Sequence, residues 1–352
     1  MTALVFCRLA SLICIFFYVG GFAPAIALEA GQESSSQTTI RVNVNLVNVG
    51  VTVTDTRGNF VRGLRAQDFR LFDNGVEKPI TGFLSINEPA QVVLMMECGP
   101  AALFIKQSEL QAADRLVSAL APSDRLALVT YSRKPTLLLD FTSDKSEVRS
   151  ALQGINFMSG FAQLNLASSV GATLEWLASI PGKKTIVLLS SGVDISTEAD
   201  WVEVERKITA SDVRILAASV AGDIRKPKKG EKLSKDDRDE RKYVKREFAE
   251  ADKVLRLLTS ATGGRVYFPK NTKDAQHAYS EMAEYVSHEY SLAFAPTLQD
   301  GIAHSLRVKT NNPWHRVAHR LAYIAPLPTN FSSVSPDFSR VYQDLWRQGE
   351  TI

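Results

Sequence analysis

A chain of 352 residues, 45% of them hydrophobic, is large and apolar enough for one large domain or two modest ones. Lysine and arginine exceed aspartate and glutamate by only three (41 against 38), so net charge does not favour a nucleic-acid-binding protein. Of the three cysteines, Cys7 and Cys14 lie within the first 27 residues, which leaves Cys98 alone in the remainder and excludes a disulfide framework there.

The first 27 residues have the pattern of a secretory signal peptide. Arg8 is followed by an apolar run, Leu9–Phe22, and then by Ala25-Ile26-Ala27, with small residues at the first and third places. The run is shorter than the roughly 20 residues of a membrane-spanning helix, although an uncleaved anchor is the alternative. We therefore expect an exported protein, periplasmic or secreted, with a polar linker over residues 28–39.

Residues 40–88 are predicted to form a small all-β module of the sandwich type. Apolar and polar residues alternate from Ile40 to Thr54, as in a half-buried strand. Asp73-Asn74-Gly75 predicts a hairpin turn, because Asn and Gly tolerate positive φ. We read Lys78–Leu84 as a single returning strand.

The pattern changes at residue 90. Val92–Met96 is a continuous apolar run, which is typical of a strand buried on both faces. Strand and helix patterns then alternate as far as residue 288. Residues 90–288 therefore predict an α/β domain with a doubly wound, mostly parallel sheet of Rossmann-like type.

Three further strands are predicted within residues 289–325, at Tyr290–Ala295, Ser305–Thr310 and Arg316–Ile324. They either form a second β lobe or return to complete the module of residues 40–88. We favour the return, because that module alone has few strands for a stable sandwich. Residues 326–352 are predicted to be a tail.

Residues 225–246 form a basic insertion in the α/β domain. The segment holds eleven Lys or Arg and five Asp or Glu residues. A flexible solvated insertion is the default interpretation. The alternative is a basic arm that contacts acidic polymer or lipid head groups through Lys226, Lys228 and Lys229. Tyr243 is its only aromatic residue, so nucleic acid is not an expected partner.

Several stretches in this order and spacing resemble the bacterial von Willebrand factor A-related proteins that carry an N-terminal Ig-like β segment. The resemblance covers roughly residues 40–326 and implies an A-type domain, which usually mediates protein–protein contacts. It is carried by Val49–Asp55, Gly63–Phe69, Asp73–Gly75, Val92–Met96, Ser123–Ser132, Thr185–Gly192, Thr262–Arg265 and Tyr290–Pro296.

The resemblance also implies a metal-dependent adhesion site, built from Asp-x-Ser-x-Ser after the first core strand, a Thr from a second loop and an Asp from a third. Here these positions hold Glu97, Gly99 and Ala101, then Phe161 or Ala162, then Ser191. Magnesium takes six oxygen ligands, and the weak candidates are Glu97, Ser190, Ser191 and Asp194. We therefore expect no cofactor, with a magnesium ion as the alternative.

No nucleophile–base or metal motif of an enzyme is present, and we expect no enzymatic activity. We expect a protein-interaction or scaffold module whose partner, not named by the sequence, contacts the loops at Glu97, Cys98, Pro100, Phe161 and Ser191. The alternatives are a metal-dependent adhesin centred on Glu97 and a purely structural component of a secreted assembly. For Cys98 itself, a small buried hydrophobe is favoured over a mixed disulfide.

Overall fold

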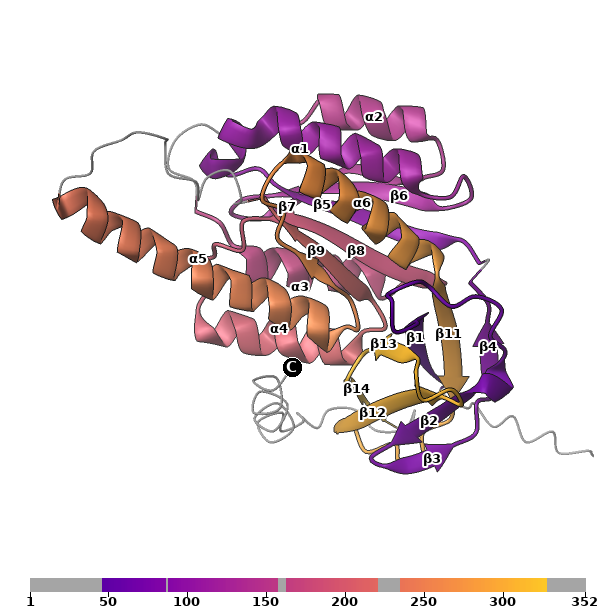
Figure 1. Ribbon diagram of the computed structural model, residues 1–352. Helices are drawn as coiled ribbons and strands as arrows, with labels where there is room; N and C mark the ends of the chain where they lie inside the picture. Colours follow the sequence, from indigo (N-terminus) through magenta and orange to yellow (C-terminus); the bar gives the residue numbers. More distant parts are fainter. Residues whose placement is uncertain (1–45, 87, 158–162, 221–234, 328–352) are drawn as a thin grey trace, which may run out of the picture. The chain divides into compact units, whose positions relative to one another are not determined.

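The computed structural model describes residues 46–86, 88–157, 163–220 and 235–327 (Figure 1). Several predicted features lie outside these ranges. They are the signal peptide, the linker, residues 40–45, the tail from residue 328, Phe161, Ala162, Lys226, Lys228 and Lys229. The backbone of Pro100 is described, but its side chain is not.

A six-stranded sheet forms the centre of the α/β part. Its strands lie in the order β10-β9-β8-β5-β6-β7, parallel throughout except for β7, which runs antiparallel to β6 at the edge. The predicted α/β fold with a mostly parallel sheet is therefore confirmed. The strands are β5 (Ala90–Glu97), β6 (Arg125–Tyr131), β7 (Pro135–Thr142), β8 (Lys183–Ser190), β9 (Arg214–Ser219) and β10 (Val266–Tyr267).

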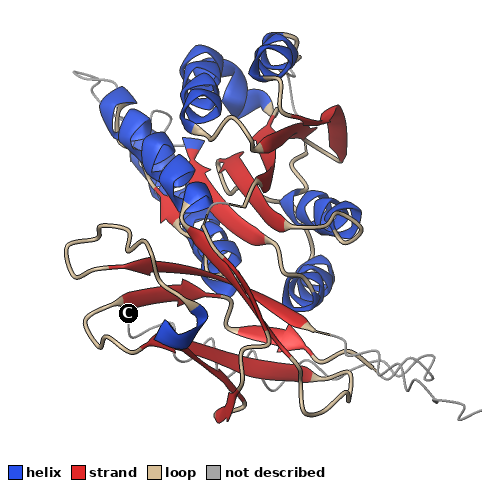
Figure 2. Ribbon diagram, turned by 90° about the vertical axis from the view of Figure 1, so that its right-hand side faces the viewer, coloured by secondary structure: helices blue, strands red, loops and turns tan. Residues whose placement is uncertain are grey.

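Helices cover both faces of this sheet (Figures 1 and 2). One face packs against α1 (Pro100–Ala119), α2 (Lys145–Gln153) and α6 (Thr272–Ser287), and the other against α3 (Leu166–Leu177), α4 (Glu198–Ala210) and α5 (Lys235–Ala261). Alternate residues of β5 pack into the hydrophobic cores on the two faces of the sheet. Leu94 and Met96 lie on the first face, and Val93 and Met95 lie on the second. The continuous apolar run of β5 follows from this double burial.

The β part consists of two four-stranded antiparallel sheets, ordered β13-β1-β11-β4 and β14-β12-β2-β3. Strand β11 pairs with β1 and β12 pairs with β2, so strands from residues 289–325 lie beside strands from residues 47–84. Buried side chains from both sheets form one core. The elements are β1 (Val47–Thr54), the 3-10 turn η1 (Ala66–Asp68), β2 (Phe69–Asp73), β3 (Val76–Lys78), β4 (Gly82–Leu84), β11 (Glu289–Phe294), β12 (Ala303–Thr310), β13 (Arg316–His319) and β14 (Ala322–Ile324).

Two predicted strands are each divided between the two sheets. The segment Lys78–Leu84 separates into β3 and β4, because Pro79 cannot donate a ladder hydrogen bond. The segment Arg316–Ile324 separates into β13 and β14 at Arg320. The guanidinium of Arg320 donates to the carbonyl oxygens of Ser211 at 2.7 Å and Asn48 at 2.6 Å, which fixes the chain where it crosses.

The interpretation of residues 225–246 as a flexible insertion along their whole length is wrong, because part of the segment belongs to helix α5. The helix begins at Lys235, so residues 235–246 are helical. The physical reason is composition, since residues 231–261 contain no Gly or Pro, and Lys, Arg and Glu favour helices. Despite its length, α5 is too charged to cross a membrane, and no other helix in the described ranges is long and apolar enough to do so.

Candidate functional site

The loops that follow β5, β6 and β8 meet at one edge of the central sheet. The register places Glu97 beside Tyr131, and Met96 beside Leu189, so the carboxyl ends of the three strands lie level. Open α/β sheets bind their ligands at this edge. We call the surface formed by residues 97–99, 131–132, 163–165 and 190–197 the loop edge.

The carboxylate of Glu97 is the centre of a buried hydrogen-bond network at the loop edge. Its Oε2 atom accepts hydrogen bonds from the backbone N–H of Ser191 at 2.7 Å and from the Ser191 hydroxyl at 2.8 Å. The hydroxyls of Tyr131 and Ser190 lie 3.3 and 3.4 Å from the same oxygen and 2.6 Å from each other. Glu97 is completely buried, so these donors replace its water. They join the loop after β5 directly to the loop after β8.

Asp194 joins the loop after β8 to the loop before α3. Its Oδ1 atom accepts hydrogen bonds from the backbone N–H of Leu166 at 2.7 Å and from the Ser196 hydroxyl at 2.8 Å. The N–H of Ile195 donates to the carbonyl of Leu164 at 2.9 Å. Because Leu166 is the first residue of α3, the Asp194 carboxylate also satisfies a free N–H group of that helix start.

The side chain of Leu164 lies against the start of α1. Gly99 is the N-cap of this helix, and Pro100 occupies its first position. A Cβ atom on Gly99 would lie 2.7 Å from Cδ2 of Leu164. Any larger residue at position 99, including the serine implied by the family resemblance, therefore requires Leu164 to move.

Two carboxyl groups near the loop edge are buried with unsatisfied oxygens. Burial raises the pKa of Glu97, although the donors from Ser191, Tyr131 and Ser190 oppose that shift. Glu109 on α1 is 3% exposed, and both its oxygens lack hydrogen-bond partners. Burial, and secondly the charge of Glu97, raise the pKa of Glu109 well above its ordinary value. Burial likewise raises the pKa of the Cys98 thiol to about 12, so this thiol is not a reactive thiolate.

The residues that the structure describes contain no group of three or more His, Cys, Asp or Glu side chains able to hold a metal ion. Oε2 of Glu97 is already surrounded by donors, and position 99 carries no side chain. Oε1 of Glu97 and Oδ2 of Asp194 are buried without a hydrogen-bond partner, and a magnesium ion would need further oxygen ligands beside them.

The structure thus brings some of the predicted site residues together and not others. Glu97, Ser190 and Ser191 share one network, whereas Asp194 acts on the start of α3. Sequence reasoning missed Tyr131 and Glu109. Glu109 had a detectable signal, since it lies at helical spacing from the buried Ala113 and Leu116. A charged residue on such an apolar stripe is unusual.

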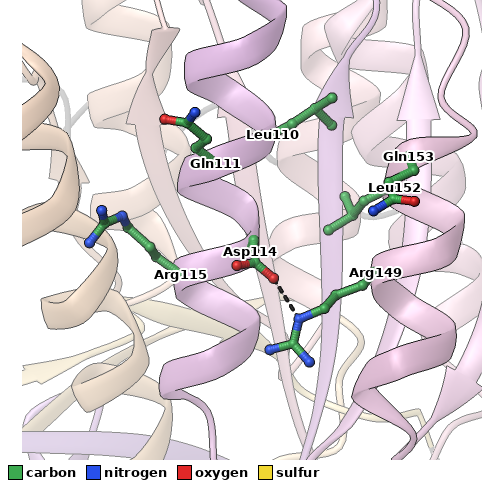
Figure 3. A pocket seen from close by; sticks show the side chains of 7 residues that line it. All are labelled: Leu110, Gln111, Asp114, Arg115, Arg149, Leu152 and Gln153. Atoms are coloured by element: carbon green, nitrogen blue, oxygen red, sulfur yellow. Dashed lines mark hydrogen bonds and ion pairs between the residues drawn. The ribbon is translucent and has the colours of Figure 1, made fainter.

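A separate cavity of about 520 Å³ lies between α1 and α2 (Figure 3). Asp114 and Arg149 point toward each other across it and form an ion pair with a nitrogen–oxygen distance of 2.6 Å. The Arg149 guanidinium also donates to Ser118 at 2.8 Å. The charges of Asp114 and Arg149 therefore satisfy each other rather than a ligand.

Residues 103–193 match the family model of the von Willebrand factor type A domain, which confirms the family resemblance over that stretch. A von Willebrand factor type A structure from Catenulispora acidiphila is similar at 10% identity and a TM-score of 0.44, over 88% of this chain and 80% of that one. A conserved hypothetical protein BatB from Bacteroides thetaiotaomicron is similar at 14% identity and a TM-score of 0.39, over 57% and 99%. No curated protein matches the chain.

Proposed function

We propose that this chain, whose residues 103–193 match the von Willebrand factor type A domain, is an exported protein-interaction module that binds a protein partner at the loop edge without a metal ion. The observation that carries the proposal is the position of Glu97. Its carboxylate fixes the loops after β5 and β8 through direct hydrogen bonds to Ser191. A surface whose loops are already fixed loses little conformational entropy on binding a partner.

The loop edge also offers an apolar contact. Ile195, in the loop after β8, is 53% exposed. Large apolar side chains surrounded by polar groups are the usual centre of a protein interface. The proposal includes no enzymatic step. The basic insertion, with Lys226, Lys228 and Lys229, remains a candidate second contact for acidic polymer or lipid head groups.

A pull-down from the exported fraction tests the partner site, with the purified chain as bait. Ile195→Asp places a charge on the loop edge and is expected to abolish capture. Val76→Asp is the matched control, because Val76 is similarly exposed (58%) but lies in the β part. Equal capture by both variants would exclude the loop edge as the docking surface. Recovery of the chain alone would favour the purely structural alternative.

Calorimetry with magnesium and manganese tests whether the protein binds either ion. We expect no binding tighter than millimolar, and we expect partner capture to be unchanged by a chelator. Metal binding in the micromolar range that Glu97→Gln removes would overturn the proposal and support a metal-dependent adhesin.

A further inference from the structure

A groove of about 680 Å³ lies at the end of the sheet opposite the loop edge. It runs between the carboxyl ends of α3 and α4 on one side and β1 and β14 on the other. Its apolar lining includes Leu46, Leu174, Ala178 and Ala210. Leu46 is 47% exposed, so the groove presents a large apolar side chain to an occupant. We call this site the seam groove.

The chain passes the seam groove immediately before the end of the described residues. Ile324 and Pro326 both line it, and the description ends at Leu327. The remaining 25 residues of the sequence, 328–352, therefore start beside the groove. A tethered segment of this kind has a millimolar effective concentration at the site, so even a weak contact is populated.

The sequence of these residues has the pattern of a short amphipathic helix. Ser335-Pro336-Asp337 is a helix start signal, and Gly349 is a stop signal. Between them, apolar residues recur at helical spacing: Phe338, Val341, Tyr342, Leu345 and Trp346. An isolated helix of about 13 residues is marginal in water, so such a stripe needs an apolar surface to cover it.

We propose that residues 336–348 pack their apolar stripe into the seam groove of the same chain. The connecting residues 328–335 can extend over roughly 27 Å, which is ample for a site that begins at Pro326. The charges are compatible, because both sides are of mixed sign. Residues 336–348 hold two acidic and two basic residues. The groove is lined by the cations Arg206, Lys207 and Arg320 and by the acids Glu175 and Asp212.

The proposed position of residues 336–348 is compatible with partner binding at the loop edge. It does not depend on the proposed function. The groove lies near the amino ends of β8 and β9, whereas the loop edge lies at their carboxyl ends. A tail held in the groove therefore leaves the loop edge free for a partner.

Disulfide crosslinking tests the proposal in the chain expressed from residue 28. Ala210→Cys, which lines the groove, is paired with Leu345→Cys. The control pairs Val202→Cys with Leu345→Cys, since Val202 is on the same helix and exposed but does not line the groove. We expect the first pair to oxidise at least about tenfold faster than the control, within one molecule and independently of concentration. Equal rates would overturn the proposal, and crosslinks only between molecules would assign the groove to a second copy.

Hydrogen exchange on the unmodified chain gives an independent test that does not need the cysteine variants to fold. Amides of residues 338–346 are expected to exchange at least about tenfold more slowly than in the isolated peptide of residues 328–352. Equal exchange rates would contradict the proposal. Neither test uses the loop edge, so failure here is distinguishable from failure of the proposed function.

Discussion

The Nη1 atom of Arg214 lies 2.7 Å from the Oε2 atom of Glu289, and both side chains are almost completely buried. Arg214 begins β9 of the central sheet, and Glu289 begins β11 of the β part. The same nitrogen donates to the Thr52 hydroxyl at 2.5 Å. The contact with Glu289 is an ion pair without good hydrogen-bond angles, because Oε2 has no hydrogen-bond partner. It joins strands of two different sheets in a buried environment.

Removal of one partner from this pair is expected to be costly. Glu289→Gln leaves the Arg214 charge buried without compensation, and we expect the free energy of unfolding to fall by about 3–5 kcal/mol. The double variant Arg214→Met with Glu289→Leu removes both charges, and it is expected to recover most of this loss. Urea unfolding of the two variants measures both values.

The exposed pair Arg70–Glu77 is the matched comparison. Its nitrogen–oxygen distance is 2.5 Å, but about half of each side chain is exposed. Glu77→Gln should therefore lower the free energy of unfolding far less than Glu289→Gln does. Similar losses for Glu77→Gln and Glu289→Gln would show that burial does not set the strength of the Arg214–Glu289 pair.

Gly50 is expected to tolerate no side chain, because Glu289 occupies the space beside it. A Cβ atom at position 50 would lie 2.6 Å from Oε1 of Glu289. Gly50→Ala must displace that carboxylate, and we expect a loss of about 1–3 kcal/mol in thermal or urea unfolding. Gly154→Ala is the control, since its nearest neighbour is 3.4 Å away and its φ of −78° suits alanine. Equal effects of the two substitutions would argue against the displacement of Glu289.

Ser191→Ala tests the network that fixes the loop edge. The variant removes the hydroxyl that donates to Oε2 of Glu97 at 2.8 Å, but it keeps the backbone N–H at 2.7 Å. We expect the free energy of unfolding to fall by about 1–2 kcal/mol, because a buried carboxylate loses one donor. Ser260→Ala, which removes an exposed hydroxyl on α5, should change it by less than about 0.5 kcal/mol. Weaker partner capture by the Ser191 variant alone would connect the network to binding.

The central sheet could be predicted from the sequence because its strands are buried on both faces. Such strands are written as short continuous apolar runs, as in Val92–Met96. The sequence did not predict which of the two β sheets each short strand joins. The apolar pattern hardly changes at Pro79 or at Arg320, where the chain passes from one sheet to the other. At the site, family positions identified Glu97 and Ser191. The role of Tyr131 depends on the register between β5 and β6, which local sequence does not encode.

Glu109 is expected to make stability depend on pH. Its pKa is ordinary in the unfolded chain, near 4.5, and well above that value in the folded protein. Between the two values the folded state keeps a proton that the unfolded state has released, so stability falls as pH rises above about 4.5, by up to about 1.4 kcal/mol per pH unit. Glu109→Gln cannot release a proton. Relative to the original protein, the variant should therefore gain stability in urea unfolding as pH rises above about 4.5.

Glu77→Gln supplies a control of opposite sign for this pH dependence. A hydrogen bond from Arg70 lowers the pKa of Glu77, so the original protein loses that contribution as pH falls below about 4.5. The Glu77 variant should therefore be the less stable one at neutral pH, and its deficit should shrink on acidification. Because Glu77 is exposed, this effect should be small. A pH–stability curve of Glu109→Gln that ran parallel to that of the original protein would contradict this prediction. It would show that the ionised Glu109 carboxylate finds a stabilising partner in the folded protein.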